Sequence, residues 1–283
     1  MQPARFDSVS SYIDSDSMIN TDKYLEHSRK CIRCLYAKRD FFYTSGNWRG
    51  VAQSRVFKPS SSTASNVLVF GHSDYKTNFL HLFPMSLSGY KEMWGTNVSP
   101  FGAKLHSLPL GLTNPSDESQ LHRIFGNVDH LRQATNSSDF PQKFNNSTYA
   151  NFSINTSPRN RYKLATYLNT LGIELANMDM SEIGRIVYLR ELRQNNFVVC
   201  PQGNGPDTHR LWETLYMGGT PVVLSSKYMN HLVENLPVIV LKSWRQLADI
   251  KLMEENWHKL NEREFNYENL NVNYWINKFC PID

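Results

Sequence analysis

Three side chains between positions 209 and 213 have the types and the spacing of a nucleotide-diphosphate site. His209 and Arg210 stand four and three positions before Glu213. On a helix the first two share one turn, and Glu213 lies about 6 Å further along the axis on the same face as His209. A cation beside free backbone N–H groups suits a diphosphate, and a carboxylate one turn deeper suits the paired hydroxyls of a ribose. The alternative is a surface helix with an ordinary His–Glu pair.

The surrounding sequence predicts the elements that must position these side chains. Residues 197–200 and 221–224 are short apolar runs typical of buried strands. The turn between them is rich in glycine and proline, and Asp207 or Thr208 can cap a helix that stops at a pair of glycines. A glycine turn that leads into a helix forms an anion site, and ligands of such sheets bind beyond the carboxyl ends of the strands. We therefore expect the site in this strand–turn–helix–strand unit.

The same segment, CPQGNGPDTHRLWETLYMGGTPVV, resembles the donor-binding segment of the exostosin-like glycosyltransferases. The pattern of that family is an apolar strand, Cys-Pro-x-Gly, Thr-x-Arg, a Glu three residues later and then Gly-x-Pro-Val. The matching positions here are Cys200, Pro201, Gly203, Thr208, Arg210, Glu213, Gly219, Pro221 and Val222. Gln202 stands where many members of the family carry a basic residue. The likeness is dense in this segment and only suggestive elsewhere.

The resemblance implies an α/β fold with two Rossmann-like domains in a GT-B arrangement, in which the C-terminal domain holds most of the nucleotide sugar. The donor-binding residues would then be Gly203, Asn204, Gly205, Thr208, His209, Arg210 and Glu213. Retaining GT-B enzymes often carry two glutamates eight residues apart across this helix. Gly205 and Pro221 stand at that distance from Glu213, so we expect inversion of the sugar.

Length and composition predict more than one domain. The chain has 283 residues, 40% of them hydrophobic and 12% aromatic, which is enough for two cores. The polar stretch 128–148 is typical of an inter-domain linker. We therefore place an acceptor-side Rossmann-like domain at 1–147 and a nucleotide-sugar-binding domain at 148–265. By resemblance to GT-B enzymes, the aromatic tail at 266–283 should pack back on the first domain.

A turn in the first domain carries the candidate catalytic base. Residues 66–70 are typical of a strand, so His72 and Asp74, which follow it, should lie at the carboxyl edge of the first sheet. Either side chain could take the proton of an acceptor hydroxyl, because an imidazole or a desolvated carboxylate has a tunable pKa. The alternative is a turn in which Asp74 caps a helix.

A second helix start carries further candidates for the donor phosphates. Residues 149–154 are typical of a strand, and the turn after them leads into a helix with Arg159 and Arg161 in its first turn. Either arginine could reach a diphosphate. An exposed helix start without a ligand explains the same pattern.

Charge and composition limit the other classes of function. The formal net charge of +4 is too small to indicate nucleic-acid binding, so no nucleic acid is expected. The basic residues between 29 and 39 form either a solvated helix face or a peripheral contact with an anionic acceptor or membrane headgroups. The sequence contains no run of 18 apolar residues, so no transmembrane helix is predicted.

The cysteines and acidic motifs indicate neither a metal nor a cofactor. Cys31 and Cys34 form a C-x-x-C without the second pair that a zinc site needs, and we expect them on a buried helix face in a reducing, cytoplasmic compartment. The Asp-x-Asp at 14–16 lies in a polar lead-in and not after a convincing strand. We expect no metal, and no cofactor besides the nucleotide-sugar donor substrate.

These patterns together favour an enzyme, a hexosyl- or pentosyltransferase. It would move a sugar from a nucleotide-diphosphate donor to a hydroxyl of a glycan acceptor, without a metal and with inversion. Two alternatives stay open. One is a catalytically silent nucleotide- or glycan-binding protein, and the other is a basic α/β protein whose cations contact nucleic acid.

Overall fold

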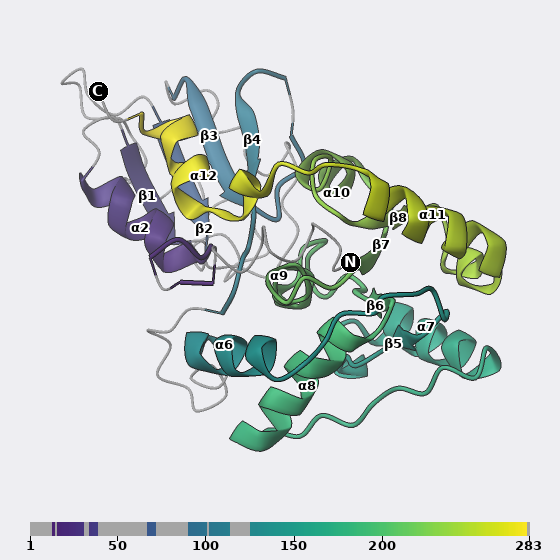
Figure 1. Cartoon of the computed structure of the whole chain (residues 1–283). Coiled ribbons are helices and arrows are strands. Elements are labelled where there is room, and N and C mark those ends of the chain that lie inside the picture. The colour runs from purple at the N-terminus through teal and green to yellow at the C-terminus, as the bar shows by residue number, and fades with distance from the viewer. Residues whose placement is uncertain are drawn as a thin grey trace.

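The computed structural model describes residues 13–14, 16–30, 34–38, 67–71, 90–100, 102–113 and 125–281. Within these residues the chain forms two four-stranded sheets with helices around them (Figure 1). All strand pairs in both sheets are parallel. The prediction of an α/β fold with parallel sheets is therefore confirmed.

The first sheet contains four strands in sequence order: β1 (Cys34–Lys38), β2 (Val67–Gly71), β3 (Glu92–Thr96) and β4 (Leu105–Leu108). Strand β2 is buried along its whole length, as expected for an apolar strand in a parallel sheet that is covered on both faces. Helix α2 (Thr21–Lys30) lies against β1 and β2. The prediction that Cys34 lies on a helix is wrong, because α2 ends at Lys30 and the backbone of Cys34 pairs with Val67.

In the second sheet, the direction in which successive strands are added changes once, next to β5. Its order is β5 (Thr148–Tyr149), β6 (Phe197–Val199), β7 (Pro221–Leu224) and β8 (Ile239–Leu241). An isolated parallel bridge joins Ala150 to Leu175 at the other edge of β5. The chain therefore moves outward from β5 to Leu175 and then crosses back to β6. Such a switch point is where open parallel sheets bind ligands, in the crevice beyond the carboxyl ends of the strands.

Helices connect these strands and cover the second sheet. They are α7 (Pro158–Thr170), α8 (Glu182–Gln194), α9 (His209–Tyr216), α10 (Lys227–Leu232) and α11 (Ile250–Glu262), with short 3-10 turns η3 (Ile154–Thr156) and η4 (Trp244–Ala248). The position of α9 between two strands agrees with the sequence prediction. Thr208 occupies the N-cap position of α9, without a side-chain capping hydrogen bond.

The predicted linker at 128–148 begins with a helix. Helix α6 (Val128–Asn136) packs against α8 (Figure 1). Asn127 caps it by accepting a hydrogen bond from the Asp129 N–H at 2.9 Å, and Leu131 and Ala134 are buried. Residues 128–136 of the predicted linker therefore form a packed helix, because two apolar side chains lie on one face of an otherwise polar stretch.

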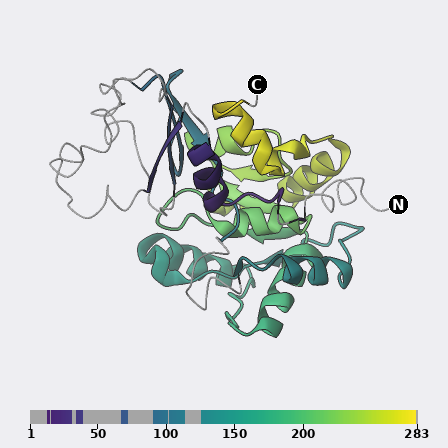
Figure 2. The ribbon, with the colours of Figure 1, turned by 90° about the vertical axis from the view of Figure 1, so that its left-hand side faces the viewer.

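The C-terminal segment returns to the first sheet. The 3-10 turn η5 (Tyr267–Leu270) leads into α12 (Val272–Phe279), which lies beside α2 (Figure 2). The ring of Phe279 lies 6.3 Å from that of Tyr24 and 6.2 Å from that of Trp94, between centroids.

Cys280 is disulfide-bonded, so the expectation of reduced cysteines is wrong for this residue. Among the helices in the described ranges, none has the length and apolar character that crossing a bilayer requires.

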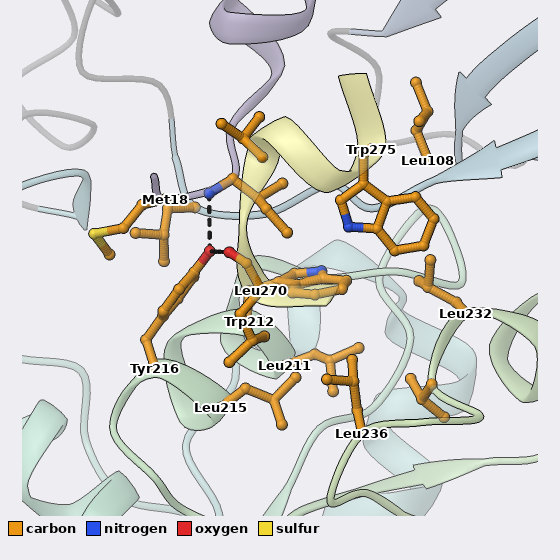
Figure 3. Close-up of a cluster of buried hydrophobic side chains, with 14 of the residues drawn as sticks. Met18, Leu108, Leu211, Trp212, Leu215, Tyr216, Leu232, Leu236, Leu270 and Trp275 are labelled. Carbon is orange, nitrogen blue, oxygen red and sulfur yellow. Dashed lines mark hydrogen bonds between the residues drawn. The ribbon is translucent and has the colours of Figure 1, made fainter. Parts of the chain in front are cut away.

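Helix α9 lies at the centre of the main core. Its side chains Leu211, Trp212 and Leu215 are buried among apolar residues from both ends of the chain (Figure 3). The hydroxyl of Tyr216 accepts a hydrogen bond from the Ile19 N–H at 2.8 Å and donates one to the Leu270 carbonyl at 2.7 Å (Figure 3). One side chain therefore joins the N-terminal segment, the central helix and the C-terminal segment.

Replacing Tyr216 by phenylalanine should destabilise the protein without creating a large cavity. Tyr216→Phe leaves a buried N–H and a buried carbonyl without partners, and we expect the free energy of unfolding to fall by about 2–4 kcal/mol. Urea denaturation measures this change. Tyr162→Phe is the control, because the Tyr162 side chain is 64% exposed, and its effect should stay within about 0.5 kcal/mol. Equal stability of the two variants would contradict this role of Tyr216.

Candidate functional site

A cavity of about 440 Å³ lies at the switch point of the second sheet. Segments that follow β5 and β6 line it, together with the first half of α8 and the start of α9. The loop after β4 of the first sheet contributes Leu110 and Thr113 to the wall. The two sheets therefore meet at this cavity, which lies at the carboxyl ends of strands from both.

The cavity brings together most of the residues that the sequence predicts as donor-binding. Its lining includes Gly203, Asn204, Gly205, Thr208, His209, Arg210, Glu213 and Arg161. Arg159 is exposed on the first turn of α7 and is not among the lining residues. The predicted bases His72 and Asp74 lie outside the described residues.

Arg161 uses its guanidinium group to hold the glycine turn. Its three nitrogens donate to the carbonyls of Ser153, Pro201 and Gln202 at 2.8 to 3.2 Å. Burial lowers the pKa of Arg161 to about 10, and the nearby charge of Arg210 acts in the same direction. Arg161 therefore fixes the shape of the turn after β6.

Gly203 lies tightly against this arginine. A Cβ atom there would come within 3.2 Å of the Thr156 methyl group and 3.3 Å of the Arg161 Nη2 atom. A larger residue would press against the guanidinium group of Arg161, which holds the turn, so the small space at this position favours glycine.

Glu213 is paired inside the cavity wall. Its Oε1 accepts from the Arg185 Nη2 atom at 2.5 Å, and its Oε2 accepts from the Tyr188 hydroxyl at 2.8 Å. Burial alone would raise the pKa of Glu213, but the charge of Arg185 and these two hydrogen bonds lower it below its usual value. Glu213 is therefore ionised and held in one position.

Two arginines keep unused hydrogen-bond donors inside the cavity wall. Arg185 is 2% exposed, and its guanidinium carbon lies 4.9 Å from the ring centroids of both Phe125 and Tyr188. Within the described part of the chain, the Nε and Nη1 atoms of Arg185 and the Nε atom of Arg210 are buried without hydrogen-bond partners. Buried unsatisfied donors are costly, so these three donor nitrogens favour an anion in the cavity.

Arg185 and Tyr188 were not predicted from the sequence, although a signal for Arg185 was present. Arg185, Leu189 and Leu192 stand at helical spacing, and all three are buried on α8. An arginine in line with core leucines indicates a buried cation, and a buried cation needs a partner. The partner itself, Glu213, is 28 residues away and could not be read from this spacing.

Asp207 connects the two sheets at the edge of the cavity. Its carboxylate accepts from the Leu110 N–H at 2.8 Å, the Trp212 indole N–H at 2.9 Å and the Tyr228 hydroxyl at 3.1 Å. Its own N–H donates to the side chain of Asn97 at 2.9 Å. The sequence analysis considered Asp207 only as a helix cap.

His209 has a fixed tautomer. Its Nδ1 atom lies 2.8 Å from the Gly111 carbonyl, and because a carbonyl can only accept, Nδ1 carries the hydrogen and the neutral ring keeps its lone pair on Nε2. Gly111 has a φ of 70°, and a Cβ there would lie 2.1 Å from the Ile19 carbonyl oxygen. The position that orients His209 therefore requires glycine.

Comparison with known proteins adds no family to this description. No protein-family model matches the chain, and no curated protein sequence matches it either. Among the residues that the structure describes, no three His, Cys, Asp or Glu side chains gather as metal ligands would.

The carboxyl of Asp207 should titrate well above the ordinary range of an aspartate. Burial raises its pKa to about 6 from 3.8, although the hydrogen bonds from Leu110, Trp212 and Tyr228 act in the opposite direction. A pKa that is higher in the folded state gives stability that is present below about pH 4 and is lost as the pH rises through 6. Relative to Asp207→Asn, the wild-type protein should lose about 3 kcal/mol between these limits.

Carbon-13 NMR of the carboxyl group, assigned with the same Asn variant, measures the midpoint directly. Urea unfolding of both proteins at several pH values measures the change in stability. A midpoint near pH 4, with a stability difference that is independent of pH, would contradict this description of Asp207.

Proposed function

We propose that the chain is a glycosyltransferase of GT-B type, which transfers a sugar from a nucleotide-diphosphate donor to a hydroxyl of a glycan acceptor. Two parallel sheets whose strand ends meet at one cavity are compatible with two Rossmann-like domains in that arrangement. The resemblance of the 200–223 segment to exostosin-like enzymes gives the reaction class. The expectation of inversion without a metal belongs to the same proposal.

The three unpartnered guanidinium nitrogens are the observation that carries the proposal. They belong to Arg185 and Arg210, which line the cavity at the switch point. A diphosphate there would supply the missing acceptors, and the charge-assisted bonds would be strong because the donors are buried. The start of α9 lines the same cavity without a side-chain capping hydrogen bond from Thr208, and the helix dipole there favours an anion.

Glu213 suits the ribose of such a donor. Each of its carboxylate oxygens accepts one hydrogen bond within the protein, and each has a second lone pair for a ribose hydroxyl. The same bonds make Glu213 a structural residue, since its removal leaves the charge of Arg185 buried without a partner. A loss of nucleotide binding in a Glu213 variant would therefore not separate the two roles, and Arg210 offers the cleaner test.

The chemistry needs a leaving group that is stabilised and a base that is well placed. The acceptor oxygen bonds to the anomeric carbon, the bond from that carbon to the diphosphate oxygen breaks, and the diphosphate leaves with the electron pair. The arginines stabilise the charge that forms on the diphosphate. The hydroxyl proton passes to a base on the opposite face of the sugar.

The base is expected from the first sheet. His209 lines the cavity with a lone pair on Nε2, but it adjoins Arg210, on the side assigned to the leaving diphosphate. The predicted bases His72 and Asp74 follow β2 and keep that assignment as a sequence prediction. The alternative, a catalytically silent binding protein, is the outcome in which nucleotide binds and no sugar is transferred.

Removing the positive charge of Arg210 should weaken nucleotide binding specifically. We expect Arg210→Ala to weaken binding of uridine or guanosine diphosphate by about 1.5–3 kcal/mol, the range of a hydrogen bond to a charged group. Isothermal titration calorimetry measures this loss. Arg190→Ala is the matched control, because Arg190 lies on α8, does not line the cavity, and donates to the Ser137 hydroxyl at 2.9 Å. Equal losses in the two variants would indicate an unspecific charge effect and contradict the site.

Turnover should depend on the predicted base in the first domain. We expect His72→Ala to lower the rate of sugar transfer by about 100- to 10,000-fold, the usual share of general-base catalysis, with little change in nucleotide affinity. Asp74→Asn should lower it far less if Asp74 only caps a helix. His209→Gln, measured in the same assay, tests the base on the other side of the cavity. A large loss in that variant and none in His72→Ala would overturn the assignment.

A further inference from the structure

A second cavity, of about 590 Å³, lies at the carboxyl ends of β7 and β8. Strand β7 ends at Leu224 and β8 at Leu241, and the lining includes the residues that follow them, Ser225, Ser226 and Lys242. This is again the edge at which parallel sheets bind ligands. Helix α7 and the turn η4 complete the wall.

The two cavities are separated by the turn after β6. Residues 203–205 of this turn line the first cavity, whereas Pro201, Gln202 and Pro206 line the second. Arg161 borders both, and its hydrogen bonds to the carbonyls of Pro201 and Gln202 hold the turn between them. The second cavity is therefore a separate site and not an extension of the first.

The second cavity carries positive charge that nothing within it balances. Lys163, Lys242 and Arg245 line it, and no Asp or Glu is found among its described lining residues. Within the described part of the chain, none of these three side chains forms an ion pair. The first cavity differs, since its arginines share the lining with Asp179, Asp207 and Glu213. Concave surfaces lined by one sign of charge concentrate ligands of the opposite sign.

Two half-buried aromatic rings provide the remaining wall. Tyr167 lies on α7, and its hydroxyl donates to the Arg245 carbonyl at 3.2 Å, which fixes the ring beside the cations. Trp244 packs partly against the smaller hydrophobic core and also lines the cavity. Aromatic faces of this kind cover the apolar C–H face of a sugar ring, while serine and amide groups nearby can bond to its hydroxyls.

We propose that this second cavity binds a sugar that carries a tetrahedral oxyanion, a phosphate or a sulfate ester. The oxyanion would lie among Lys163, Lys242 and Arg245, and the sugar ring would lie against Tyr167 and Trp244. The volume is in the range of ordinary small-molecule sites. A nucleotide fits less well, because no carboxylate is available among the described lining residues for its ribose hydroxyls. The site does not depend on the transferase proposal, and either can fail without the other.

Binding of glucose 6-phosphate and glucose 6-sulfate to the full chain tests the site, with isothermal titration calorimetry as the measurement. The two esters distinguish the phosphate from the sulfate. We expect at least one to bind, and Lys242→Ala and Arg245→Ala each to weaken it about tenfold. Lys251→Ala is the matched control, because Lys251 is an exposed cation on α11 that does not line the cavity. That variant should bind as the wild-type protein does.

A second pair of variants distinguishes the contribution of the Trp244 ring to binding from that of the positive charges. Trp244→Ala should weaken the sugar ester and leave inorganic phosphate unaffected, whereas Trp244→Phe should restore the sugar ester. Arg210→Ala, in the first cavity, should leave both ligands unaffected.

Three results would overturn the proposal. The first is no binding of either ester by a protein whose melting temperature is normal. The second is equal weakening by Lys251→Ala and by the cavity variants, and the third is tighter binding of adenosine monophosphate than of both esters.

Discussion

The buried carboxylate of Asp207 is the constraint on which the arrangement of the two sheets depends. It accepts hydrogen bonds from the loop after β4, from the centre of α9 and from α10, while its backbone N–H bonds to Asn97 beyond β3. A carboxylate in a low-dielectric interior is tolerated only when its oxygens are well supplied with donors. The first sheet supplies one of those donors, so the two sheets cannot separate without leaving this group unsatisfied. The wall that Leu110 adds to the cavity is a direct result.

Two buried arginines beside the cavity, Arg161 and Arg185, have different roles. Arg161 uses all three nitrogens to bind backbone carbonyls, so it shapes the turn, and no nitrogen of its guanidinium group is left without a partner. Arg185 pairs with Glu213 and contacts two aromatic rings, yet two of its nitrogens stay without partners in the described structure. The sequence placed only Arg161 at a helix start near the site, and the hydrogen-bond partners in the structure separate the structural cation from the candidate ligand-binding one.

Local patterns predicted part of the second sheet well, but the strand predicted at 149–154 ends at Tyr149 and residues 154–156 form the turn η3. The apolar runs of β6 and β7, the glycine turn and the helix at His209–Tyr216 all follow from spacing and turn residues within one segment. The pairing of Arg185 with Glu213 and the four-way contact of Asp207 did not follow, because partner choice across 28 or 97 residues depends on tertiary packing. The helix at Val128–Asn136 was missed for another reason, since only Leu131 and Ala134 mark its buried face in a polar stretch. Cys34 was misplaced because its helical spacing continues past the end of α2.

The two hydrogen bonds of the Tyr216 hydroxyl limit how early during synthesis the central helix can be fully buried. Its two partners, Ile19 and Leu270, stand 197 residues before it and 54 residues after it. On the ribosome, the apolar face of α9 therefore emerges long before the segment that completes its burial. Contacts of such long sequence separation form slowly, and exposed apolar surface in the meantime favours aggregation and chaperone binding. The burial of the central helix is thus completed only after the segment around Leu270 has been made, and the two α/β halves are not expected to become stable one after the other during translation.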